Sequence, residues 1–329
     1  MSKKLYSTPI IILRKKIEGE NSIEEIAYRI SRRLSIPVLE CPCHSSSLSD
    51  LLSNIKFVKD IKAPVYHIIS PAEAYLLPFL NSGKKIFTHH DLGTNNSKKK
   101  LYECIKFIFA IWFPRLFADE VTFVSEETKN ESKSLGLRKN PEKMHVIYNS
   151  YDTRLIPIEK KRNNSKKIIL HIGTAERKNL LGMLNACKDL NVKLLIIGKL
   201  HDEQIKCIKN NHIDYENYFD CSFEEIVKFY NECDIVSFPT FYEGFGLPAI
   251  EANAMHKPVI VGDIPIMHEV CKDSGYYVNP NDINEIRSAV EKLISDSNLY
   301  NLYVEKGIKN AKRFEENIII SQYQELYYS

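Results

Sequence analysis

The residues best suited to do chemistry lie in one short stretch, FYEGFGLPAIEANA, at 241–254. Glu243 and Glu251 stand eight positions apart in it, with a Gly-x-Gly between them. Glycines let backbone N–H groups approach a ligand, and the positive end of the helix that opens at Pro248 favours an anion such as a diphosphate. Glu251, about one turn inside that helix, could accept both hydroxyls of a ribose. The expected diphosphate contacts are Gly244, Phe245, Gly246 and Leu247.

Strands and helices must position this stretch, and they alternate along the chain in two blocks. In the first block the pattern predicts strands at 8–13, 64–70, 84–90, 119–125 and 143–149, and helices at 22–34, 102–113 and from 126. In the second it predicts strands at 167–173, 192–199, 234–239 and 257–262, and helices at 179–190, 223–233, 248–255 and 283–296. Such alternation indicates parallel sheets covered by helices, with ligands beyond the carboxyl ends of the strands.

A polar, charged, proline-containing stretch at 154–167 separates the two blocks and predicts a linker. We therefore expect an α/β protein of two Rossmann-like, doubly wound domains that face a central cleft. The first domain covers 1–153 and the second 168–310. A helix at 311–329 follows and is expected to cross back to the first domain.

Composition is that of an ordinary globular protein: 44% of the 329 residues are hydrophobic and 26% charged. No apolar stretch approaches the roughly 18 residues of a membrane-spanning helix, and the basic start lacks a signal-peptide core. We expect a cytoplasmic protein. The eight cysteines are scattered without the paired spacing of a zinc site, so reduced thiols are expected.

Charge is divided unevenly, with +7 over residues 1–155 and −4 over the remainder. Either the two halves bind different partners, or the asymmetry is chance on a solvated surface.

Three lysines, 98–100, precede an apolar helix with Phe107, Phe109, Trp112 and Phe113. This composition is typical of a helix that lies on an anionic membrane, which would be the inner face of the inner membrane. The alternative is that the helix packs on the sheet of the first domain, because such a helix is equally apolar. Nothing in the pattern indicates nucleic-acid binding.

The spacing Glu243-x7-Glu251 resembles the signature of retaining glycosyltransferases of the two-Rossmann (GT-B) type, in glycosyltransferase family 4. HIGTAERKNLLGMLNAC, VKLLIIGKL, FEEIVKFYNECDIVSFP and KPVIVGDIPIMHEVCKDSGYYVNPND follow in the order of that family. FTHHDL (87–92), ADEVTFVSEET (118–128) and PEKMHVIYNSYD (141–152) also match. The resemblance covers nearly the whole chain.

The resemblance implies that the second domain binds a nucleotide-sugar donor and the first domain the acceptor. Lys178 then neutralises the charge that builds on the leaving diphosphate. Many family members place an arginine just after the glycine of this loop, where this chain has Thr174, which is expected among the donor-binding residues together with Arg177 and Lys178. Arg177 either substitutes for that cation or faces solvent. Glu243 would contact hydroxyls of the donor sugar.

In the first domain, the resemblance aligns His90 with the family's strand-end histidine, which lies beside the donor sugar. Its neighbour His89 should point into the sheet, because adjacent strand residues face opposite sides. Asp91 could touch the acceptor. The loop after the first strand often carries Gly-Gly in the family but has only Gly19 here, so it is expected to shape the acceptor cleft.

The resemblance, taken with these residues, implies a retaining, metal-independent transfer of a sugar, with His90, Glu243 and Lys178 as the expected catalytic residues. The chain has no Asp-x-Asp metal motif; Asp214-Tyr-Glu216 is the nearest approach and lies in a predicted loop. No cofactor is expected, and the donor would be a UDP- or GDP-linked sugar. The acceptor would be a glycan or lipid-linked saccharide of bacterial surface polysaccharide synthesis. Two alternatives remain: a nucleotide-sugar epimerase of the same fold, and a non-catalytic partner in glycan assembly.

Overall fold

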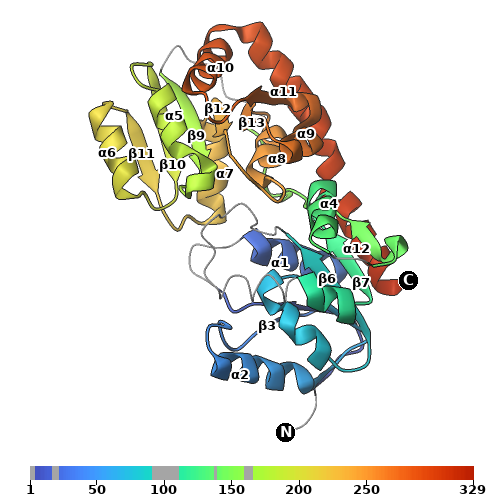
Figure 1. The fold of residues 1–329 in the computed structure, drawn as a ribbon. Helices are drawn as coiled ribbons and strands as arrows, with labels where there is room; N and C mark the ends of the chain where they lie inside the picture. Colours follow the sequence, from blue (N-terminus) through green and yellow to red (C-terminus); the bar gives the residue numbers. More distant parts are fainter. Residues whose placement is uncertain (1–3, 17–21, 91–110, 137–138, 159–165) are drawn as a thin grey trace. The chain divides into compact units, whose positions relative to one another are not determined.

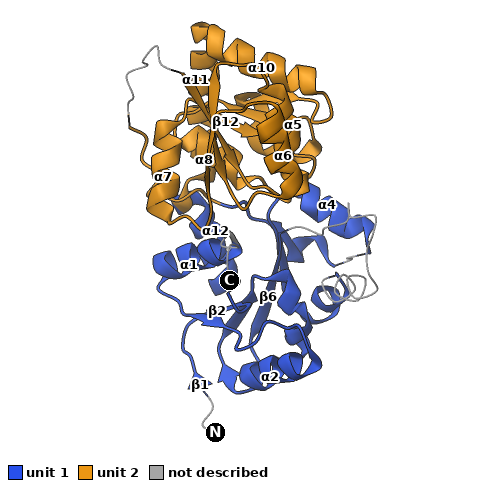
Figure 2. Cartoon of the chain, turned by 90° about the vertical axis from the view of Figure 1, so that its left-hand side faces the viewer, with its two compact units in different colours: residues 1–149, 317–329 blue, residues 150–316 orange. Residues whose placement is uncertain are grey.

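The computed structural model describes residues 4–16, 22–90, 111–136, 139–158 and 166–329. The chain forms two compact units (Figures 1 and 2). Unit 1 comprises residues 1–149 and 317–329, and unit 2 comprises residues 150–316. The boundaries therefore lie at 149/150 and 316/317, whereas the sequence placed them at 153/154 and 310/311.

Unit 1 contains a parallel sheet in the order β3-β2-β5-β6-β7-β8. The strands are β2 (Ile10–Leu13), β3 (Val38–Glu40), β5 (Val65–Ile68), β6 (Lys84–His89), β7 (Glu120–Phe123) and β8 (Met144–Val146). A short parallel pair joins β1 (Lys4–Leu5) to β4 (Ile61–Lys62). Its helices include α1 (Ser22–Leu34), α2 (Leu48–Lys59), α4 (Glu126–Ser134) and α12 (Glu316–Tyr328), with 3₁₀ turns η1 (Pro71–Phe79) and η2 (Pro141–Lys143).

The five strands expected in the first block are all present, and the helix expected at 22–34 is α1. Ser125 caps α4 by accepting from the backbone N–H of Thr128 at 3.0 Å. The expected end of a helix near Pro114 is wrong, because residues 111–117 are helical. Pro114 cannot donate a backbone hydrogen bond, but its carbonyl accepts from the N–H of Ala118 at 3.1 Å, so the helix continues beyond it. The remainder of that expected helix, 102–110, lies outside the described residues.

Unit 2 contains a second parallel sheet, in the order β11-β10-β9-β12-β13-β14. The strands are β9 (Lys167–Ile172), β10 (Val192–Ile197), β11 (Tyr215–Tyr218), β12 (Ile235–Phe238), β13 (Val259–Gly262) and β14 (Gly275–Val278). The helices are α5 (Leu180–Ala186), α6 (Asp202–Asn210), α7 (Phe223–Glu232), α8 (Leu247–Ala254), α9 (Pro265–Cys271), α10 (Ile283–Ser295) and α11 (Ser297–Ala311). The 3₁₀ turns are η3 (Glu176–Lys178), η4 (Lys272–Ser274) and η5 (Lys312–Phe314).

The expected strands and helices of the second block are present, but the loop expected around Asp214-Tyr-Glu216 is wrong. Strand β11 runs there, and among the described strands it pairs only with β10, at the edge of the sheet. Its residues alternate between exposed and half-buried, as befits an edge strand. Because its sequence, YENY, has no apolar run like the central strands, that pattern alone did not reveal it.

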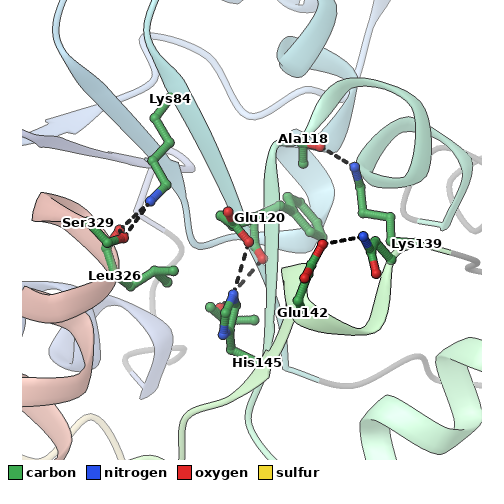
Figure 3. Close-up of polar contacts among 11 residues, drawn as sticks. Lys84, Ala118, Glu120, Lys139, Glu142, His145, Leu326 and Ser329 are labelled. Atoms are coloured by element: carbon green, nitrogen blue, oxygen red, sulfur yellow. Dashed lines mark hydrogen bonds and ion pairs between the residues drawn. The ribbon is translucent and has the colours of Figure 1, made fainter.

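Helix α12 belongs to unit 1 and is tied to the sheet by buried polar contacts. The hydroxyl of Tyr327 lies 2.6 Å from Nδ1 of His67, whose Nε2 lies 2.6 Å from Oγ1 of Thr88. Thr88 in turn lies 2.6 Å from Oγ1 of Thr122, so the chain of contacts crosses β5, β6 and β7. Lys84 on β6 donates to the Leu326 carbonyl at 2.7 Å (Figure 3).

Candidate functional site

The loop after β9 is built around a glycine and an asparagine with positive φ. Gly173 has φ +97°, a backbone conformation that favours glycine, and a Cβ on it would lie a tight 3.0 Å from Cγ of Lys178. Asn179 has φ +58° and donates to the carbonyls of Pro239 and Pro280 at 3.0 and 2.7 Å. These contacts fix the loop against the segments that follow β12 and β14.

Lys178 lies almost buried at the centre of the site. Its Nζ is 2.7 Å from Oε1 of Glu243 and 4.5 Å above the ring centre of Phe238. Only 13% of its side chain is exposed. Burial lowers the pKa of Lys178 below its ordinary value, and the nearby Glu243 carboxylate offsets only part of this effect. The lysine is therefore no solvated helix-start residue: it is held toward a carboxylate from a neighbouring loop.

Arg177 forms an ion pair with the same carboxylate oxygen, Oε1 of Glu243. Its side chain is 44% exposed, and that of Glu243 only 8%. The Thr240 hydroxyl lies 3.1 Å from the same oxygen and 2.8 Å from the Arg177 carbonyl. One carboxylate oxygen thus faces two cations, and the open question over Arg177 is answered in part, since its guanidinium lies in the site beside Lys178.

Glu243 and Glu251 flank the start of α8, as the sequence predicts. Gly246 adopts φ +97° as the residue before the helix, where an added Cβ would collide with Met267. Phe245 is buried with its ring centre 5.6 Å from that of Phe314. Gly244 and Leu247 complete the turn. The helix begins at Leu247, so its N-terminus lies between the two glutamates.

Thr174 occupies the position where relatives of the resembled family often carry arginine. Its Oγ1 donates to the Lys199 carbonyl at 2.6 Å, and its own carbonyl accepts from Gln204 at 2.8 Å. The hydroxyl hydrogen is thereby used inside the fold. Thr174 consequently braces the loop, and the cations of this site come from Arg177 and Lys178.

Sequence reasoning missed three residues that shape the site: Phe238 under Lys178, Thr240 beside Glu243, and Tyr230 beside Glu251. Tyr230 is buried in α7 and donates to Oε2 of Glu251 at 2.8 Å. Phe238 and Thr240 could have been predicted from their place at the carboxyl end of β12, where ligands bind in parallel sheets. Nothing in the local pattern of α7 marks Tyr230.

In unit 1, His90 follows directly after β6. Burial lowers the pKa of His90 to about 4; a hydrogen bond with the backbone of Ile69 opposes this shift, and the nearby Arg14 adds to it. Among the described residues its Nε2 has no hydrogen-bond partner. His89 points into the sheet as expected, fully buried with its ring 5.3 Å from that of Phe123. Asp91 and Gly19 lie outside the described residues.

Within the described part of the chain, no three His, Cys, Asp or Glu side chains are grouped so as to hold a metal ion. In that same part, no helix has both the length and the apolar character needed to cross a membrane.

Each of the two units has a parallel β-sheet flanked by helices, and the sheet of unit 2 carries this site. This architecture is the GT-B fold of glycosyltransferases. HepE of Anabaena, in complex with UDP and glucose, superposes with a TM-score of 0.79 over 97% of this chain and 99% of its own, at 15% identity. WaaG, a glycosyltransferase involved in lipopolysaccharide biosynthesis, gives 0.77 over 98% and 100%, at 11% identity. These likenesses confirm the predicted fold.

The family model of glycosyl transferases group 1 matches residues 152–310, nearly all of unit 2. Unit 2 is therefore similar to the glycosyl transferases group 1 family over the matched residues. The O-antigen chain mannosyltransferase RfbU of Salmonella typhimurium is 26% identical over 299 residues, which cover 82% of this chain and 83% of RfbU. The resemblance seen in the sequence is confirmed at this level.

Proposed function

We propose that the protein is a retaining, metal-independent hexosyltransferase that moves a sugar from a UDP- or GDP-linked donor to a glycan or lipid-linked saccharide. The observation that carries the proposal is the pairing of Lys178 and Arg177 with Glu243 beside the N-terminus of α8. Two cations and a helix end together suit a diphosphate and need no metal ion to neutralise it.

In this proposal each part of the site has one task. Lys178 and Arg177 bind the diphosphate, and the turn at residues 244–247 adds its backbone N–H groups. Thr174 supports the loop that presents these cations. Glu251 accepts the ribose hydroxyls, and Glu243 contacts the donor sugar. His90, with Nε2 available to accept a hydrogen bond, orients the sugar.

The reaction proposed is a same-face displacement. The bond between the anomeric carbon and the phosphate oxygen breaks, while the acceptor oxygen bonds to that carbon on the same face. The leaving phosphate oxygen accepts the proton of the acceptor hydroxyl, so no nucleophile from the protein is required. Lys178 and Arg177 stabilise the negative charge that develops on the leaving diphosphate.

The biological setting is proposed from the relatives. RfbU is named an O-antigen chain mannosyltransferase, and WaaG is described as acting in lipopolysaccharide biosynthesis. We propose that this chain likewise acts in bacterial surface polysaccharide synthesis, in the cytoplasm or at the inner face of the membrane. The complex of HepE with UDP and glucose supports a nucleotide-linked hexose as donor class.

A transfer assay tests the proposal. The protein is incubated with UDP- and GDP-linked hexoses and with membrane glycolipid extract, and products are analysed by mass spectrometry and NMR. We expect a new glycoside whose anomeric configuration matches that of the donor. An inverted anomer would overturn the retaining assignment, and a donor inverted at C2 without transfer would establish the epimerase alternative. Binding of a donor with neither transfer nor hydrolysis would favour the non-catalytic alternative.

A further inference from the structure

We infer that Glu243 competes with the diphosphate for Lys178 and Arg177, and thereby sets how tightly the nucleoside diphosphate product is held. The inference rests on the proposed function and extends it. A contact between Glu243 and the donor sugar would not by itself affect ligands without a sugar, whereas competition for the cations affects every diphosphate.

The contacts of Glu243 show why the two anions must compete. A single carboxylate oxygen, Oε1, is shared by Lys178, at 2.7 Å, and by Arg177. A diphosphate that bonds the same cations must take donors away from this oxygen or share them with it. Two anions around one pair of cations also repel each other.

Burial makes the competition strong. The side chains of Glu243 and Lys178 are only 8% and 13% exposed, so water and salt screen their charges little. Removing the carboxylate would leave Lys178 and Arg177 without the one anion that contacts both, although the Glu251 carboxylate would still act electrostatically on Lys178. Such a site binds a diphosphate more tightly than one that supplies its own counterion.

The charge change during the reaction gives this competition a use. Transfer of the sugar frees a terminal phosphate, which gains close to one further negative charge at neutral pH because its second pKa is about 6. Without the Glu243 carboxylate, the two cations would therefore hold the product more tightly than the donor. A carboxylate that returns to the cations as the product leaves favours release and turnover.

Isothermal titration with inorganic pyrophosphate and with UDP and GDP tests the inference, using wild type, Glu243→Gln and a matched control. Glu291→Gln serves as the control because it removes one carboxylate from an exposed ion pair with Arg287 on α10 of the same unit. We expect the Kd for pyrophosphate to fall at least fivefold in Glu243→Gln and to stay unchanged in Glu291→Gln. The dependence of log Kd on log salt should also become steeper in Glu243→Gln.

A pyrophosphate Kd in Glu243→Gln equal to or weaker than that of wild type overturns the inference, as does absence of binding to both proteins. Circular dichroism verifies folding. If Glu243→Gln does not fold, Glu243→Asp takes its place, with a smaller tightening expected because the carboxylate is withdrawn by one methylene; no tightening overturns the inference. Lys178→Ala separates the two levels: undiminished pyrophosphate binding there refutes the diphosphate site itself, whereas weaker binding there without tightening in Glu243→Gln refutes only the competition.

Discussion

Tyr230 donates its hydroxyl hydrogen to Oε2 of Glu251 across 2.8 Å, from α7 to α8. The tyrosine is completely buried, and burial together with the carboxylate raises its pKa well above the ordinary value. The hydroxyl therefore remains a donor at any physiological pH. The Glu251 carboxylate is thus positioned by a tyrosine whose hydroxyl also lies 3.5 Å from the Pro248 carbonyl in the first turn of α8.

This relationship separates binding from positioning in a pair of variants. Glu251→Ala should weaken binding of the cognate nucleoside diphosphate by about 10- to 100-fold, because a charged hydrogen-bond partner is typically worth roughly 1.5–3 kcal/mol. Tyr230→Phe keeps the carboxylate and should weaken binding by much less. Calorimetry provides both values, and an unchanged Kd in Glu251→Ala would remove the ribose role.

Lys178→Ala should lower kcat by about 10²- to 10³-fold with the fold intact, since one electrostatic partner of a transition state is worth roughly 2.7–4 kcal/mol. Lys193→Ala is the matched control, because Lys193 pairs with Glu216 at the sheet edge. Steady-state kinetics measures the effect. Retention of more than a tenth of wild-type turnover would show that Lys178 does not face the diphosphate.

Incubation with EDTA should leave transfer activity largely unchanged. The proposed site neutralises the diphosphate with Lys178, Arg177 and the start of α8, so the reaction as proposed needs no divalent cation. The measurement is initial rate after chelation and after addition of Mn²⁺ or Mg²⁺. Loss of activity with EDTA and recovery with either metal would contradict the metal-independent reading.

Stability should fall as the pH is lowered from about 6.5 toward 3. Burial lowers the pKa of His67, His89 and His171 to about 3 in the folded protein, against 6.5 when unfolded. Between these values the unfolded chain binds more protons, so acid favours unfolding, by about 2 kcal/mol per histidine at pH 5. Chemical denaturation at pH 5 and pH 7.5 measures the difference.

His89→Phe tests one contribution separately. Both ring nitrogens of His89 lack partners among the described residues, and the ring packs between Phe87 and Phe123. We expect this variant to be at least as stable as wild type at pH 7.5 and to lose about one quarter of the acid sensitivity that the four histidines with lowered pKa, His90 included, contribute. An unchanged pH dependence would show that His89 does not titrate on unfolding.

Unit 1 should associate weakly and reversibly with anionic vesicles. Trp112 and Leu116, on the helical segment 111–117, are 48% and 62% exposed, while Ile111 packs into the core. Of the other residues on which this prediction rests, those at 98–109 lie outside the described residues, and Phe113 is partly buried against the core. Each lysine near an anionic surface contributes about 1 kcal/mol, which salt weakens.

Co-sedimentation with anionic and neutral vesicles at low and high salt provides the measurement. We expect binding to anionic vesicles at low salt only, reduced in the double variant Trp112→Ala, Leu116→Ala. Equal recovery in the supernatant with both vesicle types at low salt would eliminate the idea.

Regular patterns made most of the fold predictable. The buried runs of the central strands and the amphipathic pattern of 22–34 each indicate one structure, and the loop motifs around Glu243 and Lys178 follow strands by fixed spacing. Edge strand β11 escaped because an exposed strand needs no apolar run. Local patterns do not encode how helices and loops pack. They therefore could not predict which side chains approach Glu243, or that Tyr230 reaches Glu251 across 21 residues of sequence.

The contact between Tyr327 and His67 also bears on how the chain is made. Tyr327 lies 260 residues after His67, and the whole of unit 2 is encoded between the parts of unit 1. At roughly 5–20 residues per second of synthesis, α12 leaves the ribosome on the order of ten to thirty seconds after β8. During that interval His67 lacks the hydroxyl that pairs with its Nδ1. The N-terminal unit, although translated first, is therefore the last to be completed.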